Sequence, residues 1–389
     1  MRWLWCCLAL VASADGALAA PGCPFCPPSQ PTLSEKVAES DMVVLVQWVE
    51  SQSDPNDPDA GAKTAFQVVD PWRVAKNSQG RTWKKDDLLE WPFLRTGKKG
   101  ELFLMFGRWQ DGEPAWDLPV EISEISFQYV RQAPSPEKSG PDRLKYFLRF
   151  LEFSDPLLAG DAFSEFSKAP YEDVVALAEL LPRAKLRQWL ESAETPPLRR
   201  GFYGMLLGLC GDDNDAKFLE SQVLSKPAAD EVRLGHDGMM GGYLLLRGEP
   251  ALQKLIAAKL GDPSLPTGEM YAFLNALRFM WQYGRDRIPA ADLQGALRGF
   301  LDREDMAEVV LSDLSRAKDW SVLERLTTAY GKPPFETSSA KRRIVQFVLA
   351  CAKDQSEMPE AETAKLAKAF LDRIQREEPG VLKAAQSPF

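Results

Sequence analysis

Short runs of alternating apolar and polar residues mark the first third of the chain. Between residues 27 and 132 these runs are rich in β-branched and aromatic side chains, and turn-forming spacers separate them. Alternation with a period of two predicts half-buried β-strands, and this many in about 100 residues indicates a small antiparallel barrel or sandwich. A short helix at 33–39, capped by Thr32 or Ser34, is expected before them. The expected strands are 42–49, 64–69, 88–94, 101–106 and 127–130.

Beyond residue 141 the apolar positions change to helical spacing. The i, i+3, i+4, i+7 pattern starts at Leu144, Phe147, Leu148 and Leu151 and recurs to about residue 377. Proline and small polar residues fill 133–141, a composition that resists both helices and strands. We therefore expect a β domain at 20–132, a linker at 133–141, a helical domain at 142–377 and a tail at 378–389.

The helices repeat along the chain. Short turns inside successive helix pairs align at Gly211, Gly248, Gly284, Lys318 and Lys353, with separations of 37, 36, 34 and 35 residues. Two helices per unit at such a period predict a stacked α-solenoid. We expect Gly211 and Gly248, at equivalent turns, to adopt positive φ.

The N-terminus has the pattern of a secretory signal peptide. Arg2 supplies a positive charge, 4–12 form an apolar run and 17–19 (Ala-Leu-Ala) form a cleavage signal. The apolar run is too short to span a bilayer, so we expect 1–19 to be removed and the mature chain to be periplasmic or extracellular with no transmembrane segment. A lipoprotein, anchored at Cys23, is the alternative.

Composition narrows the classes of function. The chain of 389 residues has 47 Lys and Arg against 56 Asp and Glu, a net charge of −9, which disfavours binding to nucleic acid or anionic lipid. Its single histidine, His236, leaves one candidate base for a Ser-His-Asp triad and no pair for a two-histidine zinc site. We assign no catalytic residue, metal or cofactor.

Four cysteines remain after the signal peptide. In an oxidising compartment we expect Cys23 and Cys26 to form a disulfide. Cys210 and Cys351 lie in expected helices and are 141 residues apart, so we expect them to be buried thiols. A Cys-x-x-Cys pair can also exchange disulfides or supply half of a zinc site. No strand precedes it and no second pair follows at finger spacing, so a structural or tethering disulfide is favoured.

Tryptophan is concentrated in the β domain. Most of these side chains are expected in the core, but Trp72, Trp83 and Trp109 are candidate ligand-binding residues, since aromatic faces stack on oligosaccharides and OB barrels bind them. Six tryptophans fall within 69 residues: Trp48, Trp72, Trp83, Trp91, Trp109 and Trp116.

A glycine-rich stretch at 235–242 superficially resembles a phosphate loop. It lacks the Gly-Lys-Ser/Thr ending and a preceding strand. Glycines three apart on a helix more simply allow two helices to approach closely. His236, beside Asp237, is interpreted as an ordinary polar residue.

Two families are similar to parts of the chain. Residues 155–377 resemble HEAT-type repeats, through Asp-Pro-Leu-Leu-Ala at 155–159 and Leu-Gly-Leu-Cys-Gly-Asp at 207–212. Residues 23–132 resemble a netrin-type or TIMP-like OB barrel, through the leading cysteines and the stretches 38–44, 66–69 and 100–106. TIMP-like inhibitors ligate zinc through a free N-terminal cysteine in Cys-x-Cys. Cys23 has residues before it and stands in Cys-x-x-Cys, so inhibitor function is not carried over.

The sequence thus predicts an exported two-domain protein, an OB-like barrel followed by a HEAT-like solenoid. Because α-solenoids offer surfaces to protein or peptide partners, we expect a non-catalytic interaction module. The alternatives are a thiol redox or metal-binding accessory protein that uses Cys23 and Cys26, or a netrin-like protease inhibitor.

Overall fold

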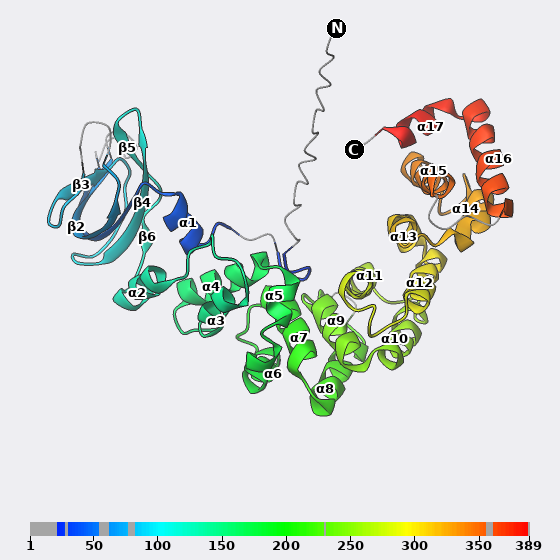
Figure 1. Cartoon of the computed structure of the whole chain (residues 1–389), viewed down its shortest axis with the longest axis horizontal. Helices are drawn as coiled ribbons and strands as arrows, with labels where there is room; N and C mark the ends of the chain where they lie inside the picture. Colours follow the sequence, from blue (N-terminus) through cyan, green and yellow to red (C-terminus); the bar gives the residue numbers. More distant parts are fainter. Residues whose placement is uncertain are drawn as a thin grey trace, which may run out of the picture. The chain divides into compact units, whose positions relative to one another are not determined.

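The computed structural model describes residues 22–27, 30–53, 62–76, 82–228, 231–354 and 361–387. The expected signal peptide lies outside the described residues. The described chain divides into two compact units (Figure 1). Unit 1 takes in the described parts of Met1–Pro24, Ser29–Leu151 and Leu157–Val174, and unit 2 those of Phe25–Pro28, Glu152–Pro156 and Val175–Phe389.

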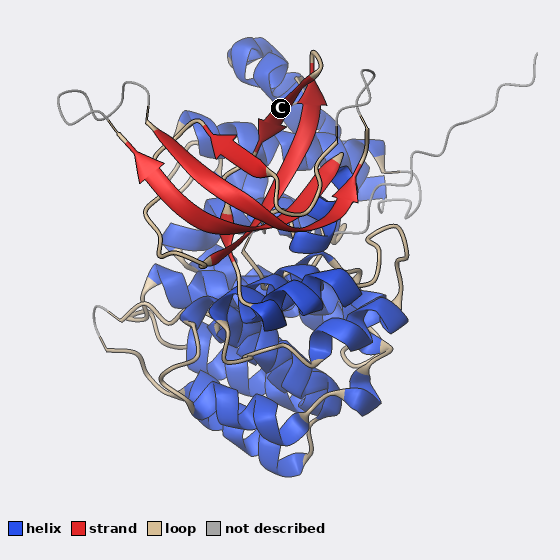
Figure 2. Cartoon of the chain, turned by 90° about the vertical axis from the view of Figure 1, so that its left-hand side faces the viewer, coloured by secondary structure: helices blue, strands red, loops and turns tan. Residues whose placement is uncertain are grey.

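An antiparallel sheet forms the β part of unit 1. Its strands run in the order β3-β2-β1-β4-β5, with β6 also paired to β4. Figure 2 shows them as one strongly curved sheet. One face forms a core around Val44, Phe66 and Phe103, each fully buried. The strands are β1 (Met42–Gln52), β2 (Lys63–Val74), β3 (Leu88–Trp91), β4 (Leu102–Gln110), β5 (Glu113–Trp116) and β6 (Val120–Glu121).

Two expectations about the sheet are wrong. Closure into a barrel is not seen among the described strands, because the end strands β3 and β5 have four residues each and pair only with β2 and β4. The stretch 127–130 lies in a helix rather than a strand. Ser123 caps that helix by accepting a hydrogen bond from the Ser126 backbone, and burial of Phe127, Tyr129 and Val130 follows helical spacing.

The β4–β5 hairpin was not expected from the sequence. Its loop is Asp111-Gly112, with φ of 52° and 87°, between the paired residues Gln110 and Glu113. Two positive φ values in a two-residue loop are what Asp-Gly favours, because that turn matches the twist of the strands. The dipeptide was therefore an available signal.

Five helices complete the described part of unit 1. The expected helix at 33–39 is confirmed as α1, whose capping box joins the Thr32 and Glu35 side chains to each other's backbone N–H groups. The segment 133–141 runs from the end of α2 into the start of α3. The helices are α1 (Leu33–Glu39), α2 (Glu124–Gln132), α3 (Pro141–Leu148), α4 (Pro156–Lys168) and α5 (Tyr171–Val175).

Unit 2 is helical in its described residues. The odd-numbered helices from α7 to α17 contact one another in order, and a second row of even-numbered helices packs beside them (Figure 1). Four of the five expected turn positions fall between the two helices of a pair, and the fifth, Lys353, is the last residue of α15. The helices are α6 (Arg183–Glu191), α7 (Pro197–Cys210), α8 (Asp213–Leu224), α9 (His236–Arg247), α10 (Glu249–Leu255), α11 (Thr267–Tyr283), α12 (Ala290–Gly299), α13 (Glu304–Arg316), α14 (Leu323–Ala329), α15 (Ser338–Lys353), α16 (Ala361–Glu377) and α17 (Pro379–Gln386).

The turns differ in backbone conformation. Gly248 has φ of 58°, as expected, but Gly211 has φ of −76°. At Gly211 the chain stays extended because the next residue, Asp212, caps α8. In the turn between α13 and α14, Lys318 has a positive φ of 52°. The turn position is thus common to the pairs, whereas its conformation is not.

Ion pairs repeat with the same period as the turns. Arg278 pairs with Asp313, 35 residues later, and Arg233 pairs with Glu269, 36 residues later. Other pairs of this kind, with separations of 34 to 37 residues, are Lys254–Glu220, Arg343–Glu308, Lys226–Asp262, Lys318–Asp354 and Lys341–Glu378. Equivalent positions of neighbouring helix pairs are therefore in contact, so the sequence period is also a structural period.

Helices α7 and α9 make a close backbone contact, which confirms the expectation from their glycines. A Cβ atom added to Gly242 would lie 2.0 Å from the carbonyl oxygen of Gly204, and one added to Gly208 would lie 2.4 Å from the Cα atom of Gly242. Only glycine leaves room for helix backbones this close.

Candidate functional site

The cysteine pair is the sharpest motif in the sequence. Both Cys23 and Cys26 are disulfide-bonded. Between them, Phe25 is 7% exposed and its ring centroid lies 4.9 Å from that of Phe279 in α11. The loop therefore buries an apolar side chain in unit 2, which is the behaviour of a structural element.

The other two cysteines are free thiols. Burial raises the pKa of Cys210 to about 11 and also raises the pKa of Cys351. Both thiols are therefore protonated near neutral pH and poor nucleophiles. Among the described residues, no group of three or more His, Cys, Asp or Glu side chains could hold a metal ion.

The three candidate tryptophans do not form one site. Trp72 packs edge-on against Phe127 of α2, with ring centroids 5.8 Å apart. Trp109 donates its indole N–H to the Ala75 carbonyl oxygen, at 2.8 Å. Only Trp83 lines a large groove, where its ring centroid lies 6.0 Å from that of Trp116.

This groove, the tryptophan groove, lies between the end strands β3 and β5. Its volume is 840 Å³, and Glu90 and Glu113 supply carboxylates to its lining. Trp91 also lines it but is 4% exposed, so its role in the core is confirmed. Sequence reasoning missed Trp116 because the β5 strand that carries it was not expected.

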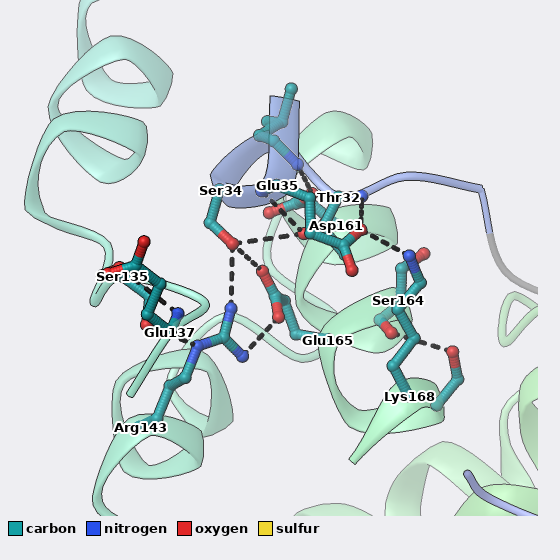
Figure 3. A network of polar contacts seen from close by, with 12 residues as sticks. Thr32, Ser34, Glu35, Ser135, Glu137, Arg143, Asp161, Ser164, Glu165 and Lys168 are labelled. Atoms are coloured by element: carbon teal, nitrogen blue, oxygen red, sulfur yellow. Dashed lines mark hydrogen bonds and ion pairs between the residues drawn. The ribbon is translucent and has the colours of Figure 1, made fainter. Parts of the chain in front are cut away.

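A buried polar network joins α1 to α4 within unit 1 (Figure 3). The Leu33 backbone N–H donates to Asp161 at 2.7 Å, and the Ser34 hydroxyl donates to Glu165 at 2.6 Å. Arg143 of α3 completes the network with an ion pair to Glu165 at 2.5 Å. The N–H group of Leu33, the first residue of α1, has no partner within its own helix and is thus satisfied by a side chain of another helix.

Burial perturbs the charges of this network. It raises the pKa of Asp161 to about 6, against hydrogen bonds from Leu33 and Tyr129 that lower it. Burial and the neighbouring Asp161 carboxylate also raise the pKa of Tyr129, whose hydroxyl donates to Asp161 at 2.7 Å. A perturbed carboxyl group can indicate a catalytic site, but structural networks produce the same shift.

The cavity next to the network favours the structural interpretation. It holds only 180 Å³, and its charged lining includes Glu35, Arg143, Glu165 and Lys168. Lys168 pairs with Glu35 and Arg143 pairs with Glu165. These carboxylates are already neutralised by partners, so the network holds α1 in place.

His236 lies at the start of α9 and is 9% exposed. Its Nδ1 atom is buried with no hydrogen-bond partner among the described residues. Burial, reinforced by the charge of Arg233, lowers its pKa to about 4. The imidazole is therefore neutral near pH 7 and a weak base. Burial raises the pKa of the adjacent Asp237, which Asn275 contacts at 3.5 Å.

A second buried charge cluster lies close to His236. Glu269 of α11 accepts hydrogen bonds from Arg233, at 2.8 Å, and from Lys259, at 2.8 Å. Lys259 belongs to a π-helical turn at Ile256–Leu260 and is 1% exposed. The loop before α9 and the first half of α11 enclose a groove of 400 Å³ beside this cluster, lined by Glu269 and Tyr271 among others.

The next groove along unit 2, the arginine groove, lies between α11 and α13. Its volume is 520 Å³, and it brings together Arg278, Trp281, Arg285 and Arg316. Sequence reasoning missed this site. The spacing of Arg278 and Trp281 places them on one face of α11, and Arg285 follows in the turn after that helix. Arg316 joins them only through the packing of the next pair.

No protein-family model, curated protein or solved structure matches the chain. The resemblances to HEAT repeats and to netrin-type barrels therefore rest on the sequence stretches alone. Within the described residues, no helix is both long and apolar enough to cross a membrane.

Proposed function

We propose that this chain is a non-catalytic protein-interaction module whose partner binds along the odd-numbered helices of unit 2. The observation that carries the proposal is the pair of neighbouring grooves, of 400 and 520 Å³, between α9 and α11 and between α11 and α13. Concave sites with a few polar groups and apolar walls are where proteins bind ligands.

The helical architecture supports this proposal. Turns and ion pairs share a period of 34 to 37 residues, so equivalent positions of neighbouring helix pairs are in contact. Contact of each unit with its neighbours is what an α-solenoid, such as one of HEAT type, requires. We propose that fold for unit 2, and export to the periplasm or outside the cell for the mature chain. Solenoids use long rows of equivalent helices as binding surfaces.

The proposal is tested by filling one groove. Ala272 lines the α9–α11 groove, so Ala272→Trp should block it, whereas Gln253→Trp on the exposed side of α10 should not. After chemical cross-linking in the envelope or secreted fraction, cross-links to a partner should map to α9, α11 and α13. They should be lost in Ala272→Trp alone. Cross-links that map to the even-numbered helices would refute the proposal.

A second candidate function rests on the tryptophan groove. Half-buried indoles of Trp83 and Trp116 beside the carboxylates of Glu90 and Glu113 suit an oligosaccharide, through stacking and hydrogen bonds to hydroxyl groups. A glycan panel with tryptophan fluorescence as readout tests it, with Trp116→Ala as the variant. Binding that survives this substitution would remove the groove from consideration.

The redox alternative is tested by thiol trapping. A structural Cys23–Cys26 disulfide should resist mild reductant in the folded chain, so that alkylation labels neither cysteine. Rapid labelling under the same conditions would favour disulfide exchange.

A further inference from the structure

The arginine groove combines positive charge with an aromatic wall. Three guanidinium groups, those of Arg278, Arg285 and Arg316, line it beside Trp281. Asp313 supplies the only carboxylate among the described lining residues. The groove is therefore positively charged, although the chain as a whole carries a net charge of −9.

The buried carboxylate of Asp313 fixes the positions of two of these arginines. Arg278 donates to both of its oxygens, at 2.8 Å each, and Arg316 donates to one, at 3.1 Å. Asp313 is 4% exposed, whereas the side chains of Arg278 and Arg316 are 38% and 70% exposed. The anchored guanidinium groups thus still present donors to solvent, and a ligand does not have to order them first.

Arg285 extends the same surface just beyond the C-terminal end of α11. Its guanidinium carbon lies 5.8 Å from the centroid of the Trp281 indole, within the range of a cation–π contact. Trp281 is half-buried, so part of its ring is open to an apolar or aromatic group of a ligand. The groove therefore offers anion recognition and apolar contact side by side.

We infer that the arginine groove binds an acidic segment of the partner protein, with Asp or Glu carboxylates on the arginines and an apolar side chain on Trp281. Planar guanidinium groups match carboxylates through paired hydrogen bonds. Arg316 is the last residue of α13 and Arg285 follows the end of α11. The backbone carbonyl groups of a helix C-terminus disfavour anions in proportion to their charge, so they disfavour a phosphate dianion more than a single carboxylate. This inference rests on the proposed function and names the chemistry of the partner.

The test uses the full mature chain and labelled synthetic peptides. One peptide alternates Glu with Leu and Phe, a second has Gln in place of every Glu, and a third carries phosphoserine instead. Binding is measured by fluorescence anisotropy at two salt concentrations. We expect the Glu peptide to bind most tightly and to weaken as salt rises.

Variants assign the binding to the groove. Arg285→Gln and Arg316→Gln should each weaken it about threefold, and the double variant about tenfold. Arg316→Gln leaves Arg278 on Asp313, so the buried carboxylate keeps a partner. Arg287→Gln is the matched control, since Arg287 is exposed, lies outside the groove lining and should bind as wild type.

Three results would overturn the inference: equal binding of the Gln peptide, preference for the phosphoserine peptide, or no change in the double variant. The cross-links described above separate the two proposals. If they map to α9, α11 and α13 while no acidic peptide binds, the inference fails and the proposed function stands. If they map elsewhere, both fail.

Discussion

The close contact between α7 and α9 leads to a strong prediction for Gly242→Ala. The new methyl carbon would lie 2.0 Å from the carbonyl oxygen of Gly204, whereas ordinary contacts lie at 3.4 Å or more. The obstacle is helix backbone, which cannot rotate away as a side chain could. The two helices must therefore separate, which weakens the packing along their whole length.

The expected cost follows from two opposing effects. Overpacking a well-filled interface costs about 1–3 kcal/mol. This site belongs at the upper end of that range, because the two helix backbones themselves must move apart. Replacing Gly by Ala inside a helix returns up to about 1 kcal/mol. We expect a net destabilisation of about 2 kcal/mol, which for a helical unit of this size lowers the Tm by about 4–8 °C.

Gly295→Ala is the matched control. Gly295 also lies inside a helix, α12, but the nearest atom to an added Cβ is the flexible end of Arg298, at 3.7 Å. Only the gain in helix propensity applies there, so the Tm should rise by about 1–4 °C, from a gain of about 0.5–1 kcal/mol.

Thermal unfolding by circular dichroism measures both shifts, and hydrogen exchange should show the loss of protection in α7 and α9 first, because neighbouring helix pairs can open separately. Gly208→Ala disturbs the same contact. The double variant should therefore lose less stability than the sum of the two single variants, because Gly242→Ala has already moved the helices apart. A Tm for Gly242→Ala at or above that of wild type would refute the close contact.

Three further predictions concern buried polar groups. Because its folded pKa is raised to about 6, the Asp161 carboxyl favours folding at low pH, and this stability, about 2–3 kcal/mol, should be lost as pH rises from about 4 through 6. In Asp161→Asn the midpoint of urea unfolding should no longer change with pH over that range. Because its folded pKa is lowered to about 4, His236 should cost stability as pH falls below 6.5, by about 3 kcal/mol, and His236→Gln should abolish that loss. Glu165→Gln removes the partner of the half-buried Arg143 and should destabilise unit 1 by about 3 kcal/mol in urea unfolding at pH 7; a cost below 1 kcal/mol would contradict the network.

Local signals in the sequence determined the regular elements. Thr32 and Glu35 form a capping box, so the start of α1 needs no other information. The turns inside the helix pairs, such as those at Gly248 and Lys318, were predicted from a period that the amphipathic helices keep over many units. The glycines of α9 likewise predicted a closely packed neighbouring helix. Glycine destabilises a helix interior, so several glycines on one helix indicate that another backbone approaches it closely.

The secondary structure of short apolar runs was decided by tertiary contacts. Four residues at 127–130 fit both a strand and one helical turn, and only the Ser123 cap with the docking of Phe127 against Trp72 made them helical. Whether the sheet closes likewise depends on how far the end strands extend and curve, which no single strand encodes.

The candidate sites were decided only by tertiary structure. The arginine groove needs Arg278 from one helix pair and Arg316 from the next, with Asp313 buried between them. The pKa of Asp161 is raised because α1 and α4 enclose it, which its sequence neighbours do not indicate. Caps, turns and periods depend on residues a few positions apart and can be predicted from sequence. Charge in a groove depends on burial and on side chains about 35 positions apart, so it exists only once the helix pairs have stacked.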